Sequence, residues 1–172
     1  MTTALVVYES LFGDARAIAE AIARGVSETI PATAVEAAQA PRQIGLETGL
    51  LVVGGPNHAL TMPRPSSRQQ AVKQYAFTAA EAERPGLREW LERVECVDGV
   101  PAAAFDTRMD HPGFLRHIDR AARAEERQLR RLGCRQLARA EHFLVTSPTG
   151  PLRPGEEQRA LDWGRTLGAL IG

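Results

Sequence analysis

The sequence has little of what several classes of protein require. It has only two cysteines in 172 residues, Cys96 and Cys134, and their spacing fits neither a metal-binding cluster nor a Cys-x-x-Cys motif. We therefore expect two reduced thiols rather than a disulfide scaffold. Lysine plus arginine and aspartate plus glutamate number 21 each, so the chain carries no net charge. A nucleic-acid partner, which would require a basic face, is not expected.

Long apolar runs are also missing. No segment reaches the length of a membrane-spanning helix, and the N-terminus lacks the basic, apolar and cleavage regions of a signal peptide. These absences predict a cytoplasmic protein without a membrane partner.

The chain does contain an alternation of apolar segments and helical patterns. Strand-like segments lie at 4–8, 32–37, 50–54, 100–105 and 142–146. Helical patterns follow the first segment and recur at 86–94, at 113–132 and from Pro154 onward. Three of the strand-like segments are nearly all apolar, as in strands buried on both faces of a parallel sheet. The sequence therefore predicts a single doubly wound α/β domain over residues 1–172, with 32–37 as an edge strand.

One connection, residues 56–85, is too long for an ordinary link between a strand and its helix, which takes roughly 2–6 residues. Residues 66–75 have the pattern of a short polar helix, but the remaining length predicts a functional loop or lid. An insertion that only decorates the fold or forms an oligomer contact is the alternative.

The first strand-like segment leads into a polar turn, Glu9 to Asp14, and then directly into a helix. This geometry suits phosphate, because a helix N-terminus offers N–H groups without intrahelical partners and a partial positive charge. The turn lacks the Gly-x-Gly-x-x-Gly of dinucleotide-binding domains, and the chain has neither a P-loop nor a Gly-x-Ser-x-Gly elbow. The carboxylates and lysine of a phospho-receiver domain are also missing.

Three segments resemble the flavodoxin-like family. Val-Val-Tyr-Glu-Ser-Leu-Phe-Gly-Asp-Ala at 6–15 resembles its phosphate loop, and Leu-Val-Val-Gly-Gly-Pro-Asn-His at 51–58 resembles its third strand and first flavin-contacting loop. Ala-Phe-Asp-Thr-Arg at 104–108 resembles the fourth strand and second flavin-contacting loop. The resemblance covers most of the chain in element order. It implies a five-stranded parallel sheet in order 2-1-3-4-5, with FMN at the carboxyl ends of the strands.

The resemblance also implies which residues bind the cofactor. They are, from the three loops in turn, Ser10, Leu11, Phe12, Gly13, Asp14 and Ala15; Pro56, Asn57, His58 and Ala59; and Thr107, Arg108 and Met109. The two ring-contacting loops contain no aromatic residue. His58, Met62, Met109 and His111 are the candidates to cover the ring, with Tyr75 and Phe77 reaching back from the insertion. Arg108 is expected either to stabilise an anionic reduced ring or an anionic substrate, or to form a surface ion pair with Asp106 or Asp110.

The phosphate loop departs from the family pattern at two positions. Asp14 stands where asparagine is preferred and Ala15 where threonine is usual, so a negative charge is added and donors are lost near the phosphate. Asp14 is equally well explained as the N-cap of its helix, filling the place of a phosphate without any ligand. Whether FMN or the Asp14 carboxylate occupies the turn stays open at this point.

Two main hypotheses follow for the function. The first is an FMN-binding redox protein, either an electron carrier with a redox partner protein or a small reductase of a quinone-like substrate. The second is a flavin-free binding or regulatory module, and a homodimer is left open in both. A third, weaker hypothesis is a metal or hydrolytic enzyme, based on histidines and aspartates between 106 and 119.

Overall fold

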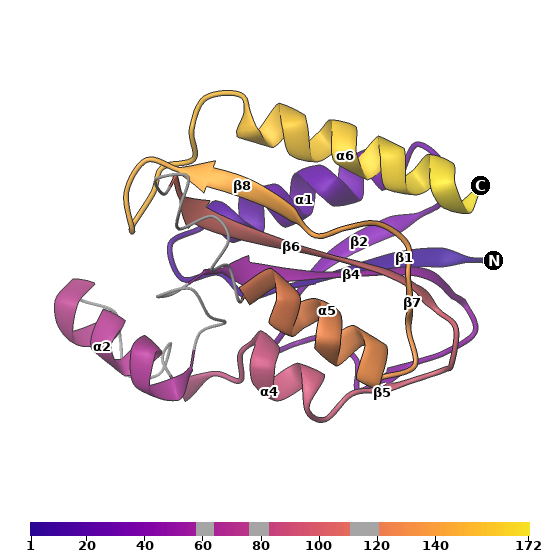
Figure 1. Ribbon diagram of the computed structural model, residues 1–172, viewed down its shortest axis with the longest axis horizontal. Helices are drawn as coiled ribbons and strands as arrows, with labels where there is room; N and C mark the ends of the chain where they lie inside the picture. The colour runs from indigo at the N-terminus through magenta and orange to yellow at the C-terminus, as the bar shows by residue number, and fades with distance from the viewer. Residues whose placement is uncertain (58–63, 76–82, 111–120) are drawn as a thin grey trace.

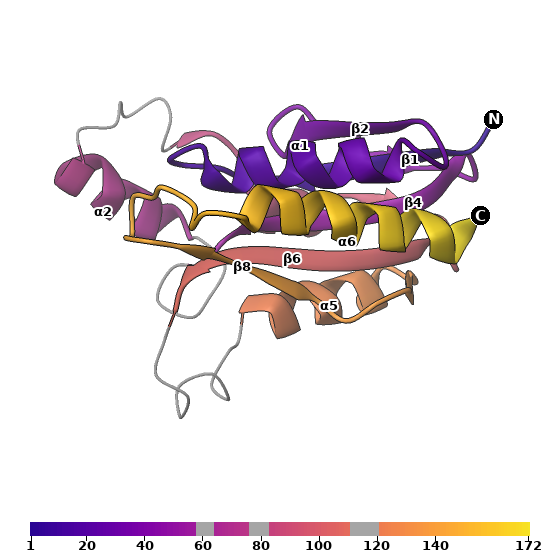
Figure 2. The same cartoon turned by 90° about the horizontal axis from the view of Figure 1, so that it is seen from above.

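The computed structural model describes residues 1–57, 64–75, 83–110 and 121–172 of the chain. A parallel sheet lies at the centre, with α1 (Asp14–Val26) and α6 (Glu156–Ile171) on one face. Helices α4 (Leu87–Leu91) and α5 (Ala121–Arg131) cover the other face (Figures 1 and 2). Helix α2 (Pro65–Tyr75) lies at one end of the molecule.

The main sheet has the strand order expected from the sequence. Strands β1 (Thr3–Tyr8), β2 (Ala32–Glu36), β4 (Thr48–Pro56) and β6 (Pro101–Met109) lie in the order β2-β1-β4-β6. The fifth position is shared by two short strands: β7 (Arg135–Gln136) pairs with the start of β6, and β8 (Glu141–Val145) pairs with its end. Each of these pairings is parallel, which confirms the order 2-1-3-4-5 with its last strand broken in two.

The central strands are buried on both faces, and this explains their unbroken apolar sequences. In β4, Leu50 and Val52 pack toward α1 and α6, whereas Leu51 and Val53 pack in the core on the α4 and α5 side. Alternate residues of a strand point to opposite faces of its sheet, so a strand covered on both sides needs apolar residues throughout. Strand β2 pairs with β1 alone among the described strands, as its weaker sequence predicts for an edge.

Helices α1 and α6 pack against each other through glycines. A Cβ on Gly164 would lie 2.3 Å from the carbonyl oxygen of Ile22, and a Cβ on Gly25 would lie 2.1 Å from that of Leu161. Gly164 and Gly168 of α6 therefore face α1 and the turn after it rather than the sheet.

A small second sheet was not predicted. Strands β3 (Gln43–Ile44) and β5 (Glu95–Cys96) pair in parallel beside the α4 face. Two-residue strands are too short to show a strand period in the sequence. Separately, none of the helices in the described ranges has both the length and the apolar character needed to cross a membrane.

Candidate functional site

A cavity of about 340 Å³ lies where β1, β4 and β6 end, and all three predicted loops contribute to its wall. The predicted residues that line it are Ser10, Leu11, Phe12, Asp14, Ala15, Pro56, Asn57, Thr107, Arg108 and Met109. Gly13 forms the turn between Phe12 and Asp14, while His58 and Ala59 lie outside the described residues. Carboxyl ends of neighbouring parallel strands share one edge of a sheet, which is why loops distant in sequence meet here.

The first loop directs the N-terminus of α1 toward this cavity. Gly13 has a φ of 95°, a left-handed conformation that favours glycine, and its N–H donates to the Ser10 hydroxyl at 3.1 Å. Asp14 and Ala15 begin the helix and lie on the cavity wall. The first N–H groups of an α-helix have no intrahelical acceptor, so they are available to an anion in the cavity.

Asp14 does not cap its own helix, which corrects the N-cap interpretation. The N-cap residue is Gly13, which has no side chain to cap the helix. The Asp14 carboxylate instead accepts a hydrogen bond from the backbone N–H of Leu152, and it lies so close to Gly150 that a Cβ there would be 2.4 Å from Oδ2. Burial raises the pKa of Asp14, and the Leu152 hydrogen bond opposes that rise. Asp14 therefore ties α1 to the segment that follows β8.

Helix α2 supplies a wall of the cavity that the sequence did not assign. Ser67, Gln70, Gln74 and Tyr75 line it, and the Tyr75 ring packs edge-to-face on Phe12 with centroids 5.4 Å apart. Ser67, Gln70 and Gln74 are spaced three and four residues apart, so they lie on one face of the helix. This spacing is the sequence pattern from which their shared position could have been predicted. The expectation that Tyr75 reaches back to the site is confirmed. Phe77, Met62 and His111 lie outside the described residues.

A buried arginine anchors α2 to the rest of the fold. Arg68 is 4% exposed, and its Nε lies 2.9 Å from Glu9 Oε1 at the end of β1 while its Nη2 lies 2.5 Å from Glu89 Oε2. The second oxygen of Glu9 accepts the Leu87 N–H at 2.8 Å. Burial raises the pKa of Glu9, and the attraction of Arg68 opposes that rise. Through these bonds, part of the long insertion becomes a fixed wall of the cavity.

No family model matches this chain, and no curated protein matches its sequence. Solved structures do match its fold, among them a flavodoxin from the domain Archaea, at 16% identity and a TM-score of 0.66 over 99% of both chains. A Streptococcus pneumoniae flavodoxin matches at 11% identity and a TM-score of 0.64, over 98% of this chain and 99% of that one.

The match to a short-chain flavodoxin associated with a bacterial microcompartment extends over all of both chains, at 12% identity and a TM-score of 0.63. The chain has the flavodoxin-like fold. Identities this low establish the fold alone, so function has to be argued from the site.

In the strand order β2-β1-β4-β6, the chain adds β2 on one side of β1 and then adds β4 and β6 on the other side. The cavity lies at the switch point between β1 and β4, where this direction reverses. Open α/β sheets bind ligands at this place. The residues present suit a flavin phosphate in two respects, the α1 N-terminus and the Ser10 hydroxyl. They suit a flat ring through the aromatic pair of Phe12 and Tyr75. The Asp14 carboxylate is the feature that opposes an anion.

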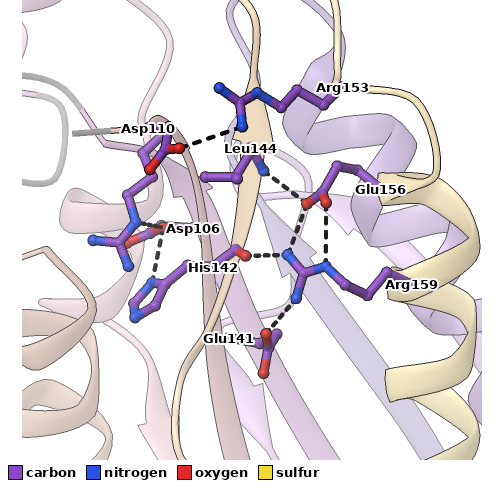
Figure 3. Close-up of polar contacts among 9 residues, drawn as sticks. Asp106, Asp110, Glu141, His142, Leu144, Arg153, Glu156 and Arg159 are labelled. Carbon is purple, nitrogen blue, oxygen red and sulfur yellow. Dashed lines mark hydrogen bonds and ion pairs between the residues drawn. The ribbon is translucent and has the colours of Figure 1, made fainter. Parts of the chain in front are cut away.

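Arg108 pairs with a fully buried carboxylate rather than on the surface. Its Nε lies 3.5 Å from Asp106 Oδ1. The same oxygen lies 3.0 Å from His142 Nδ1 on β8 (Figure 3). Asp110 pairs with Arg153 at 3.4 Å. The ion pair with Asp106 is one of those expected for Arg108, and the arginine also lines the cavity.

A second, more polar cavity of about 710 Å³ lies beside β8 and shares Arg108 and Met109 with the first. Arg159 bonds there to Glu141, to Glu156 and to the His142 carbonyl (Figure 3). Its guanidinium lies 4.4 Å from the centre of the Phe143 ring. These bonds fix β8 to α6. The metal hypothesis gains no support, because the described residues hold no group of three or more histidine, cysteine or acidic side chains placed to bind a metal. His111, His117 and Asp119 lie outside them.

Proposed function

We propose that this protein binds FMN in the cavity at the ends of β1, β4 and β6 and acts as a redox protein through it. The observation that carries the proposal is the meeting of three loops and the α1 N-terminus around one cavity. The likeness to flavodoxins of full chain length supports it. A bound flavin supplies electron and hydride transfer, and the protein holds and tunes it.

Each wall of the cavity has a distinct part in this proposal. The Ser10 hydroxyl and the first N–H groups of α1 would hold the phosphate, with Gly13 shaping the turn. Phe12 and Tyr75 would provide an aromatic surface for the ring. Arg108 would place a positive charge beside it, which favours the reduced, anionic ring, although the nearby Asp106 partly offsets that charge.

The proposal includes two kinds of electron acceptor. A redox partner protein would make this chain a carrier, whereas a quinone-like substrate would make it a small reductase. Zero net charge disfavours docking through a strongly acidic face, and a fixed α2 wall suits a small substrate beside the ring. These two observations favour the reductase.

Titration of the apoprotein with FMN and with riboflavin tests the proposal. We expect one flavin per chain by calorimetry and fluorescence quenching, with FMN binding more tightly because riboflavin lacks the phosphate. Ser10→Ala is expected to weaken FMN binding and leave riboflavin binding unchanged. Tyr75→Ala is expected to weaken both. Absence of heat and quenching at millimolar FMN would overturn the proposal.

A flavin-free module is the second candidate, and the Asp14 carboxylate favours it because it adds a fixed negative charge where the phosphate would bind. The same titration distinguishes the two. A chain that binds riboflavin as tightly as FMN would retain a ring site without a phosphate site. A chain that binds neither would support the module.

A further inference from the structure

The two cysteines of the chain lie in contact far from the proposed flavin cavity. Cys96 belongs to β5 and Cys134 immediately precedes β7, and their sulfur atoms are 3.4 Å apart although the residues are 38 positions apart in sequence. In Figure 1, β5 and β7 lie away from the end of the molecule occupied by α2. Both cysteines are free thiols.

The backbone holds the segments that carry these cysteines next to each other. The N–H of Gly99 donates to the carbonyl of Gly133 at 2.8 Å, and the N–H of Cys134 donates to the carbonyl of Leu129 at the end of α5 at 3.0 Å. Cys96 pairs with Ile44 in the small parallel sheet. Because both segments are fixed, the sulfurs have to approach by only about 1.4 Å to reach the S–S bond length of about 2.05 Å.

The two thiols differ in access to solvent, and this gives the reaction an order. Cys96 is partly exposed, whereas Cys134 is 7% exposed and packs in the core beneath α5. Burial raises the pKa of Cys134 to about 12 and also raises that of Cys96. A reagent from solvent therefore meets Cys96 first, and the thiolate that attacks it forms more readily as the pH rises.

We propose that Cys96 and Cys134 form a reversible disulfide site, oxidised by exchange with a low-molecular-weight disulfide. The Cys96 thiolate attacks one sulfur of the reagent, which forms a mixed disulfide and releases the first small thiol. Cys134 then loses its proton and attacks the Cys96 sulfur, which releases the second small thiol. The protein dithiol is oxidised by two electrons and the reagent is reduced by two, so two small thiols are formed for each disulfide.

The bond would join β5 to the segment between α5 and β7. It would close a loop that contains β6, a strand of the main sheet whose end lines the proposed flavin cavity, and α5, a helix on one face of that sheet. Constraining so long a loop stabilises a fold mainly by restricting its unfolded chain. The midpoint of thermal unfolding is therefore expected to rise on oxidation.

Incubation of the native protein with oxidised glutathione at pH 8 tests the proposal. We expect thiol titration to fall from two groups to none, the intact mass to decrease by two hydrogen atoms, and peptide mapping to join Cys96 to Cys134. Dithiothreitol should restore both thiols, and the reaction should be faster at pH 9 than at pH 7.

Two matched variants separate the steps. Cys134→Ser should stop at one stable glutathione adduct on Cys96, whereas Cys96→Ser should react far more slowly. The wild-type result decides the matter even where a variant folds poorly. Each of four outcomes would overturn the proposal: two thiols that stay free, two glutathione adducts on one chain, disulfide-linked dimers, or oxidation that occurs only in urea.

Discussion

Asp14 places a carboxylate at the start of α1, on the wall of the cavity where the proposed phosphate would bind. Two unit charges about 4 Å apart interact by about 1 kcal/mol in bulk water and by about 4 kcal/mol at an effective dielectric constant of about 20. The hydrogen bond from Leu152 holds the carboxylate in place without supplying a counter-charge. A dianionic phosphate would therefore meet a fixed repulsion.

Replacing Asp14→Asn removes this charge and keeps an oxygen that can accept the Leu152 N–H. We expect the dissociation constant for FMN to fall by roughly tenfold or more, since about 1.4 kcal/mol corresponds to a factor of ten. Parallel titrations of the wild type and the variant with FMN measure it. Riboflavin affinity should not change, and Asp162→Asn, an exposed position on α6, is the matched surface control. Equal FMN affinities in the wild type and Asp14→Asn would contradict the repulsion.

At the residue level, the resemblance to the flavodoxin-like family predicts the loop residues of the cavity wall, and each of these loops directly follows a buried strand. It does not predict what those residues bond to. Asp14 has the sequence context of an N-cap, yet its carboxylate turns to Leu152, a partner 138 positions along the chain. Glu125 has charged neighbours on both sides in its helix, Arg123 and Glu126, yet it is 1% exposed. Contacts between distant segments override local preference in both cases.

At the scale of elements, the contact between α1 and α6 depends on small residues at the helix crossing. A Cβ on Gly164 would lie 2.3 Å from the Ile22 carbonyl oxygen and 3.1 Å from the Gly25 Cα, and both are backbone atoms. Backbone atoms of a helix cannot move aside singly, so the helices would have to separate. Gly168 also faces α1, but a Cβ there would meet the Thr29 side chain at 2.8 Å, which can rotate.

Gly164→Ala is therefore expected to lower the free energy of unfolding by about 1–3 kcal/mol through overpacking, even though alanine favours the helix by about 1 kcal/mol. Gly168→Ala, on the same helix face, serves as the matched comparison and should cost less. Urea unfolding followed by circular dichroism measures both. A Gly164→Ala variant as stable as the wild type would show that the crossing is looser than its distances indicate.

Some helices and strands can be predicted from the sequence, and others cannot. Strands β1, β4 and β6 are predicted because burial on both faces requires apolar residues throughout. Strands β3, β5 and β7 have two residues each and carry no period. The helix expected at 66–75 is present as α2, but its place on the cavity depends on Arg68 bonding to Glu9 and Glu89 across the fold. A spacing pattern contains no information on such long-range pairing.

At the scale of the whole molecule, three buried carboxyl groups come together from separate elements. Glu9 follows β1, Asp106 lies on β6 and Glu125 lies on α5, and each is at most 6% exposed. Arg68 pairs with Glu9, and His142 and Arg108 pair with Asp106. The Oε2 atom of Glu125 is buried, and the described residues offer it no hydrogen-bond partner. Burial, followed by repulsion from Asp106 and Glu9, raises the pKa of Glu125 well above its ordinary value of 4.5.

This shift makes the stability of the fold depend on pH. Below its ordinary pKa of 4.5, Glu125 is neutral in the folded and unfolded states, so its ionisation does not affect the free energy of unfolding. Above that pH the unfolded chain ionises while the folded one keeps its proton, so folding loses about 1.4 kcal/mol for each pH unit until the folded-state pKa is passed. Glu125 thus destabilises the protein increasingly as the pH rises from the acidic range.

Glu125→Gln removes the ionisation and with it the slope. The free energy of unfolding of Glu125→Gln, minus that of the wild type, should increase from pH 5 to pH 8. The cost of burying the amide is the same at every pH and does not change this trend. Urea unfolding across this range measures the difference, and Glu157→Gln on the exposed face of α6 controls for the loss of one carboxyl group. A packing defect would shift the curve of unfolding free energy against pH by the same amount at every pH. Parallel curves for Glu125→Gln and the wild type would therefore mean that Glu125 ionises in the folded protein as it does in the unfolded chain.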